Sequence, residues 1–152
     1  MEQRLNLRRV APDAMTAVAN LERYVGGKVD HTLLHLVKLR ASILNGCAYC
    51  VDMHTREAID TGEDPRRLFA VGAWRESPFF SKEERAALAL TDAVTRIGDA
   101  GVSDEVWADA EAAFGTEDVA NLVVAIATIN VWNRIAVTFH TQPPALASSR
   151  EQ

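Results

Sequence analysis

Cysteine is scarce in this sequence. Only two of the 152 residues are cysteines, and four are histidines. A chain of this length can bury a core without disulfide bonds, so stability does not need to come from cysteine cross-links. Hydrophobic residues make up 48% of the chain and charged residues 24%, a composition typical of a globular protein and not of a disordered one. We predict a single domain over residues 1–152, with loose ends at residues 1–10 and 142–152.

The chain also lacks a cluster of basic residues. Its formal net charge at pH 7 is -5. Proteins that bind nucleic acid or acidic membranes carry a basic patch as their electrostatic footprint. We therefore expect neither nucleic acid nor a membrane as a partner.

No long hydrophobic run is free of polar residues. The most apolar stretch, Val119–Phe139, is interrupted by Asn121, Thr128, Asn130, Asn133 and Arg134, which makes a membrane span a poor interpretation. Residues 1–10 contain three arginines and no apolar segment of the secretory type. These features predict a cytoplasmic protein. In that reducing compartment a close cysteine pair is more often catalytic, redox-sensing or metal-binding than a permanent structural disulfide.

Strand patterns are missing as well. Nowhere do β-branched and aromatic residues alternate over five or more positions between turn signals. Helix caps and helix breakers instead divide the chain into helical segments. These segments are Pro12–Tyr24, His31–Leu44, Cys47–Asp60, Pro65–Trp74, a segment from the capping box at Ser81 to Ile97, and two more capped near Ser103 and Thr116. The predicted fold class is all-α, with about six to seven helices.

The segment His31–Leu44 carries a broad apolar arc and one narrow polar stripe. The stripe consists of His31, His35, Lys38 and Ser42. It could face solvent, or it could line a cavity that ends at Cys47. Because the apolar arc is wide enough to bury most of the helix, a cavity wall is a plausible interpretation.

Both cysteines and one histidine form the motif C-x-x-C-x-x-x-H at Cys47, Cys50 and His54. On a helix these positions lie at about 0°, 300° and 340°, so the three side chains share one face. A helix N-terminus stabilises a thiolate, which is the nucleophilic form of cysteine. His54 could take or return a proton, and the second thiol could convert a sulfenic acid into a disulfide before irreversible oxidation. The motif therefore favours a redox site.

Other interpretations of the same residues stay open. The motif offers three metal ligands, with His31 or His35 as a fourth, although structural zinc sites usually bring their ligands as two separated pairs. Cysteine is also a common buried residue, and core packing could explain either thiol. A thioredoxin-like motif would need a preceding strand and a βαβ unit, and the preceding segment here is helical.

Four segments of the chain resemble the carboxymuconolactone decarboxylase superfamily and, within it, the AhpD-like alkylhydroperoxidase branch. They are LVKLRASILNGCAYCVDMHTREA (Leu36–Ala58), AWRE (Ala73–Glu76), ERAALALTDAVT (Glu84–Thr95) and INVWNR (Ile129–Arg134). The resemblance covers roughly Leu33–Arg134, and the C-x-x-C-x-x-x-H motif is its most diagnostic part. It implies a single all-helical AhpD-like domain that assembles into homo-oligomers.

The resemblance also implies roles for individual residues. Cys50 would attack an organic hydroperoxide, Cys47 would resolve the product, and His54 would belong to a proton relay. The family implies no bound cofactor, because its enzymes are reduced again by a dithiol on a dihydrolipoyl-bearing partner. A glutamate of the same relay stands twelve residues before the first cysteine in the family, where this chain has His35. An imidazole can also accept a proton, so we include His35 among the catalytic candidates.

Several other polar residues have simpler interpretations. Glu76 could replace the missing carboxylate, although an exposed helix end is the more ordinary reading. Asn130 and Asn133 favour a structural or inter-subunit role, because buried amides need hydrogen-bond partners. Asp52 and Glu57 are expected to point away from the cysteine face into solvent.

Together these features predict a cytoplasmic, thiol-dependent peroxidase that reduces an organic hydroperoxide. A lactone decarboxylase, as in the superfamily name, is the alternative among enzymes, but that branch does not depend on a C-x-x-C pair. The alternative from another class is a redox sensor or assembly factor whose cysteines switch without turnover.

Overall fold

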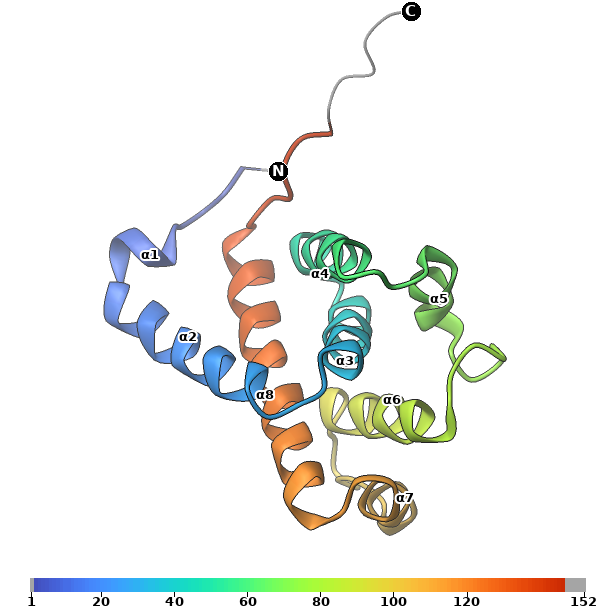
Figure 1. Ribbon diagram of the computed structural model, residues 1–152. Helices are drawn as coiled ribbons and strands as arrows, with labels where there is room; N and C mark the ends of the chain where they lie inside the picture. The colour runs from blue at the N-terminus through green and yellow to red at the C-terminus, as the bar shows by residue number, and fades with distance from the viewer. Residues whose placement is uncertain (1, 147–152) are drawn as a thin grey trace, which may run out of the picture.

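The computed structural model describes residues 2–146, and every regular element in that range is helical (Figure 1). The elements are α1 (Leu7–Val10), α2 (Pro12–Gly26), α3 (His31–Leu44), α4 (Ala48–Asp60), α5 (Pro65–Ala70), the 3₁₀ turn η1 (Val71–Ala73), α6 (Lys82–Thr95), α7 (Asp104–Phe114) and α8 (Thr116–Phe139). The predicted all-α class is confirmed. The described residues contain eight α-helices, one more than the seven at most that were predicted, because the one-turn helix α1, capped by Asn6, was not predicted.

Local capping chemistry explains where most helices begin. The Asp30 carboxylate accepts a hydrogen bond from the third residue of α3, and Ser81 and Glu84 form the predicted capping box of α6. The start of α8 differs from the prediction, since Gly115 is the N-cap and Thr116 is already helical. Gly115 has φ +77°, a conformation that side-chain-bearing residues rarely adopt, so the turn into α8 depends on glycine.

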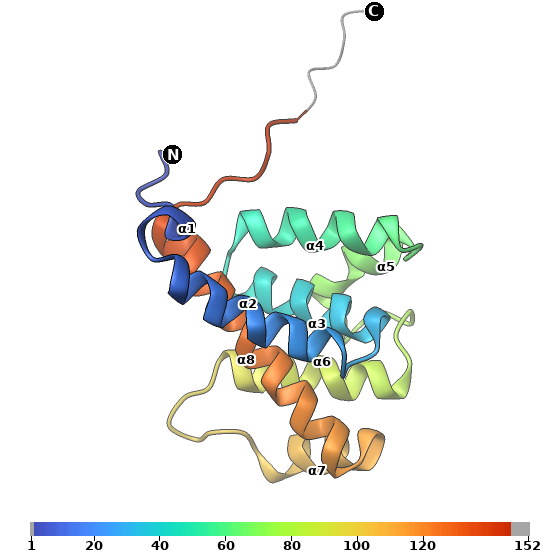
Figure 2. The ribbon, with the colours of Figure 1, turned by 60° about the vertical axis from the view of Figure 1, so that its left-hand side comes forward.

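Helix α3 runs through the middle of the fold and packs on α4, α6 and α8 (Figure 2). Leu34 and Val37 face one core cluster, whose other buried members include Leu90, Leu122 and Ile126. Leu36 and Leu39 face a second cluster, with Leu68, Trp74 and Leu88. Because both faces of α3 are buried, the position of α3 determines the position of every element that touches it.

The N-terminal segment, which was expected to be loose, is largely exposed but contacts the end of α8. The Arg4 backbone N–H donates to the Phe139 carbonyl at 2.9 Å, and the Arg4 side chain donates to the Thr138 carbonyl at 3.2 Å. Helix α1 packs against α2. At the other end, residues 141–146 have no regular structure, and the rest of the predicted loose end lies outside the described residues.

Helix α8 is the one helix in residues 2–146 that is long and apolar enough to cross a membrane by length and composition. That criterion is weak, because a core helix of a globular protein satisfies it as well. Ten residues of α8 are buried in this fold.

A buried ion pair joins α3 to α6. Both Asp92 oxygens accept from Arg40, at 2.5 and 3.0 Å, and Asp92 also accepts from Arg75 at 2.5 Å and from the Trp74 indole at 3.3 Å. Asp92 and Arg40 are 7% and 6% exposed. Burial raises the pKa of Asp92, but the hydrogen bonds from Arg40 and Arg75 outweigh burial and hold this pKa below its usual range.

Replacing this carboxylate should destabilise the fold. We expect Asp92→Asn to lower the free energy of unfolding at pH 7 by about 3 kcal/mol, because Arg40 would stay buried without an ionised partner. Since the folded-state pKa of Asp92 is depressed, its contribution is present above the unfolded value of about 3.9 and is lost as the pH falls toward the folded pKa. Denaturant titrations should therefore show that the free energies of unfolding of parent and variant differ at neutral pH, and that this difference becomes smaller at acidic pH.

The matched control is Asp109→Asn, on the exposed side of α7. It should change the free energy of unfolding by less than about 0.5 kcal/mol at either pH. Equal losses from the two substitutions would contradict a special role for Asp92.

Candidate active site

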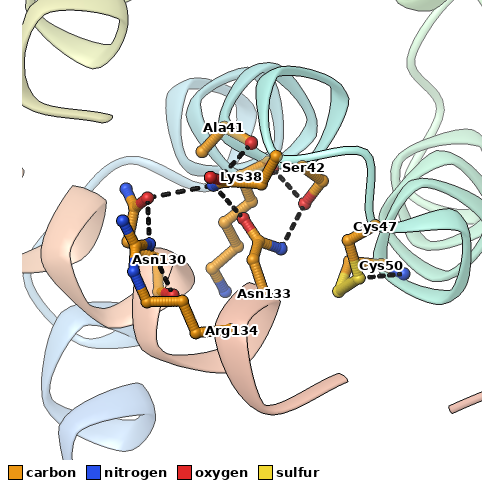
Figure 3. The surroundings of a disulfide bond; sticks show 9 residues. Lys38, Ala41, Ser42, Cys47, Cys50, Asn130, Asn133 and Arg134 are labelled. Atoms are coloured by element: carbon orange, nitrogen blue, oxygen red, sulfur yellow. Dashed lines mark hydrogen bonds between the residues drawn. A yellow bond between two sulfur atoms is a disulfide. The ribbon is translucent and has the colours of Figure 1, made fainter. Parts of the chain in front are cut away.

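Cys47 and Cys50 form a disulfide at the junction of α3 and α4 (Figure 3). Their Cα atoms lie 5.3 Å apart, and the side chains are 1% and 2% exposed. The chain reaches this position through a tight turn in which Gly46 has φ +65°. A residue with a side chain would be strained there, so Gly46 allows α4 to start directly after α3.

Cys47 caps helix α4. Its sulfur accepts a hydrogen bond from the Cys50 backbone N–H at 3.3 Å, and the helix itself begins at Ala48. The N–H groups and partial positive charge at a helix start stabilise a nearby thiolate. In this structure the sulfur that accepts a hydrogen bond from the helix start is that of Cys47. Cys50 itself lies in the first turn of the helix.

A network of amide side chains holds the turn that carries the disulfide (Figure 3). The Asn45 amide nitrogen lies 2.9 Å from the side-chain oxygens of both Asn130 and Asn133. Asn133 donates to the Ser42 hydroxyl at 3.0 Å, and the Ser42 carbonyl accepts from the Cys47 backbone at 3.0 Å. The two asparagines of α8 therefore hold the turn from within one subunit, a structural role like the one that the sequence favoured.

A cavity of about 550 Å³ opens beside Cys50. Its walls come from the N-terminal segment, α2, α3, α4 and the end of α8. Cys50 and His54 line the cavity, whereas Cys47 does not. Its larger apolar lining residues are Leu5, Leu7, Met15, Met53, Trp132, Ile135 and Phe139. The volume is in the range of small-molecule sites, and the walls suit an organic molecule with an apolar body.

His54 is buried beside this cavity and is held by Glu57. Its ring is 3% exposed, and Nδ1 lies 3.0 Å from the Glu57 carboxylate. Nε2 is buried and has no hydrogen-bond partner among the described residues. The hydrogen bond from His54 holds the pKa of Glu57 below its usual range, although partial burial acts in the opposite direction.

Glu57 is a site residue that the sequence interpretation missed. It was expected to point into solvent, yet it lines the cavity and contacts His54. A signal was present, because positions 54 and 57 are neighbours at i, i+3 on a helix. The side chain of Glu57 is 50% exposed, so it has access to both the histidine and solvent.

The polar stripe of α3 is a cavity wall for part of its length. Lys38 is 7% exposed, lines the cavity and forms an ion pair with Glu22 of α2. Glu22 also accepts from the Trp132 indole at 3.1 Å. Ser42 is fully buried. The interpretation that the stripe faces solvent is therefore wrong for Lys38 and Ser42. It holds for His31, which is exposed.

His35 does not lie beside the cysteine pair, contrary to expectation. Helices α3 and α4 run in opposite directions from the Gly46 turn, so His35 faces the end of α4, with Nε2 3.4 Å from the Thr61 hydroxyl. It lines a separate polar depression with Thr32, Glu63 and Arg67. Burial is the main cause that lowers the pKa of His35. Its catalytic role stays a prediction, and Glu76, the other candidate carboxylate, is exposed.

The side chains that could bind a metal ion are spread out in this structure. Within residues 2–146, no group of three or more histidine, cysteine, aspartate or glutamate side chains is placed to hold a metal ion. In the state described here the two cysteine sulfurs are bonded to each other.

Comparison with known proteins places the chain among its relatives. Residues 11–93, more than half of the chain, match the profile of the carboxymuconolactone decarboxylase family. The chain belongs to this family. An uncharacterized family relative, YdfG from Bacillus subtilis (strain 168), is 38% identical over 138 residues, which cover 90% of this chain and 94% of YdfG.

Solved structures share the fold of this family member. A protein of unknown function from Agrobacterium tumefaciens, described as a candidate antioxidant defence protein AhpD, is 43% identical with a TM-score of 0.92, over 95% of this chain and 99% of that chain. The debrominase Bmp8 is 24% identical with a TM-score of 0.75, over 88% of this chain and 73% of its own. The second likeness shows the fold alone. The predicted AhpD-like fold is confirmed.

The cavity geometry predicts an order of reactivity for the two thiols. After reduction, Cys50 should react with N-ethylmaleimide faster than Cys47, because Cys50 alone lines the cavity. The Cys47→Ser and Cys50→Ser variants each leave one thiol, and mass spectrometry of timed samples gives the two rates. In denaturant the two rates should become similar, and faster labelling of Cys47 in the folded protein would contradict this reading of the cavity.

Proposed function

We propose that this family member is a thiol-dependent alkyl hydroperoxidase of the AhpD type. The observation that carries the proposal is the placement of one half of a Cys47–Cys50 disulfide at a cavity that also contains the unpartnered nitrogen of His54. A reducible sulfur, a proton-transfer group and an apolar cavity are the parts that reduction of an organic hydroperoxide requires. A hydroperoxide with an apolar body is the substrate class that the walls favour.

The reaction starts from the reduced pair of thiols. The Cys50 thiolate attacks the distal oxygen of the hydroperoxide, the O–O bond breaks, and the alkoxide takes a proton to leave as an alcohol. Cys50 is then a sulfenic acid. The Cys47 thiol condenses with it, water leaves, and the disulfide seen in the structure forms.

A dithiol must supply two electrons to restore the thiols. An incoming thiolate reaches Cys50 through the cavity and displaces Cys47, whose departing thiolate is stabilised by the N–H group that contacts its sulfur. The second thiol of the reductant then attacks the reductant's own sulfur in the mixed disulfide, Cys50 leaves as a thiolate, and the reductant is released as a cyclic disulfide. Because both cysteines are almost fully buried, a dithiol on a slender arm, such as a dihydrolipoyl group, suits this site.

The alternatives differ in what they require of the cysteines. A redox sensor would form the disulfide without steady turnover. A lactone decarboxylase, to which the family name refers, would not depend on the disulfide, and no feature of this cavity favours it over peroxide reduction. The cytoplasmic location, and the absence of nucleic-acid and membrane partners, stay predictions from the sequence.

Turnover tests this proposal. With dihydrolipoamide as reductant, the protein should consume cumene hydroperoxide continuously, and Cys50→Ser should abolish the activity. His54→Ala should slow it by about 10²–10⁴-fold, as expected for the loss of a general acid–base group. Cys47→Ser should react once and then over-oxidise at Cys50, which mass spectrometry detects as added oxygen.

Two results would count against a peroxidase. Disulfide formation without continued peroxide loss would indicate a sensor. Equal, mild effects of the three substitutions would show that the peroxide reacts elsewhere.

We further propose that the protein forms homo-oligomers, as its family resemblance implies. Helix α8 leaves apolar side chains exposed on the side away from the core, among them Ala127, Val131 and Val137. Val131 and Val137 are 36% and 43% exposed. A second copy of the chain would remove these side chains from water.

Light scattering during gel filtration tests the assembly. At micromolar concentration the measured mass should correspond to two or more chains, each of 16.7 kDa. Val131→Glu should shift the mass toward one chain, because a charge would be buried without a partner, and the exposed substitution Asp109→Asn is the control. A mass of one chain for the parent protein would contradict the proposal.

A further inference from the structure

Three chemically complementary side chains lie in series on helix α4. Cys50, His54 and Glu57 occupy positions i, i+4 and i+7, which share one face of a helix. All three line the cavity. We infer that Glu57 is the positioning residue of a cysteine–histidine–glutamate triad, in which it fixes His54 so that Nε2 exchanges a proton with Cys50; this assignment rests on the proposed function.

The contact with Glu57 determines which nitrogen of His54 carries hydrogen. An ionised carboxylate only accepts hydrogen bonds, so at 3.0 Å from Glu57 the Nδ1 atom must be the donor. In the neutral imidazole the other nitrogen, Nε2, then carries the lone pair. Glu57 thus makes Nε2 the proton-accepting atom.

The surroundings of Nε2 agree with that assignment. Nε2 is buried and unpartnered among the described residues, which is an unusual state for a polar atom. The structure holds the disulfide, in which Cys50 has no proton to give. In the reduced protein the Cys50 S–H bond can break as an N–H bond forms at Nε2, leaving a thiolate, an imidazolium and the Glu57 carboxylate.

Neighbouring charges keep Glu57 ionised. Besides the hydrogen bond from His54, the positive charge of Lys38 on α3 lowers the pKa of Glu57, while partial burial acts in the opposite direction. His35 of α3 also lies near Glu57, but burial lowers the pKa of His35, so its charge contributes little at neutral pH. The remaining charged groups of the cavity are Glu22 of α2, which is paired with Lys38, and Arg8 of α1. The carboxylate therefore stays available to His54 at neutral pH.

His35, which stands where the family has a glutamate, does not take the place of Glu57 in this arrangement. The side chain of His35 faces Thr61 and the separate depression, so it does not contact the His54 ring through any observed hydrogen bond. The carboxylate that serves the histidine comes instead from α4, three residues beyond it.

Two measurements on the reduced protein test the triad without any peroxide. Two-bond ¹H–¹⁵N spectra should show His54 protonated at Nδ1 in its neutral form, and Glu57→Ala should remove that preference. In a Cys47→Ser background, alkylation of Cys50 by iodoacetamide at pH 7 should slow by about 10-fold in Glu57→Gln and Glu57→Ala, less than the loss of the histidine itself would cause. Glu57→Asp should restore part of the rate, and the spectra are assigned with His54→Gln.

The control is Asp60→Asn, which removes the same charge from an exposed position one turn further along α4. Its alkylation rate should match the parent, and thermal unfolding should show that the Glu57 variants stay folded. An Nε2–H tautomer in the parent, or an unchanged tautomer and rate in Glu57→Ala, would overturn the inference. If the triad behaves as expected but no hydroperoxide is turned over, the proposed function fails and the triad stands.

Discussion

The tight turn between α3 and α4 is the constraint on which this molecule depends. Gly46 adopts a left-handed conformation, and the Ser42 carbonyl receives the Cys47 backbone N–H directly after the turn. Only three residues therefore separate the end of α3 from the start of α4, which runs back along α3. Helix α3 is held by core packing on two of its faces. Because the turn between α3 and α4 is short, the cysteines are held in a defined position relative to α3.

The same turn sets where the polar residues beside the cavity lie along α4. The disulfide lies at the start of the helix, His54 follows one turn later, and Glu57 lies nearly one turn beyond it, all beside one cavity. No loop has to close to bring these groups together. A site built on one helix keeps the relative positions of its groups with more precision than a site assembled from loops.

Local features of the site could be predicted from the sequence, and long-range ones could not. The helix carrying Cys47, Cys50 and His54, the capping box at Ser81 and the all-α class follow from residues close in sequence. The place of Glu57 on the same helix face as His54 was a local signal that the sequence interpretation did not use, whereas the cavity beside it is formed only by the tertiary fold. Likewise, the contact of Arg4 with Phe139 joins opposite ends of the chain and leaves no local signal. The family pattern identified the position of His35, but its distance from the cysteines depends on the direction in which α4 returns.

The polar residues that interrupt the apolar stretch of α8 show why that stretch is not uniformly hydrophobic. Asn121 accepts a hydrogen bond from the Tyr24 hydroxyl at 2.8 Å, and Asn130 and Asn133 bind the Asn45 turn. Each of these buried amides thus forms a hydrogen bond with a residue outside α8, which restricts how α8 can rotate about its axis.

The residues that line the cavity come from widely separated parts of the chain. Cys50, His54 and Glu57 belong to α4, whereas much of the apolar wall comes from the N-terminal segment and the end of α8, at opposite ends of the sequence. Substitutions in those two segments can reshape the space next to Cys50 without changing the helix that holds it. The space beside Cys50 can therefore change in size and polarity while the helix that carries Cys50 and His54 stays the same.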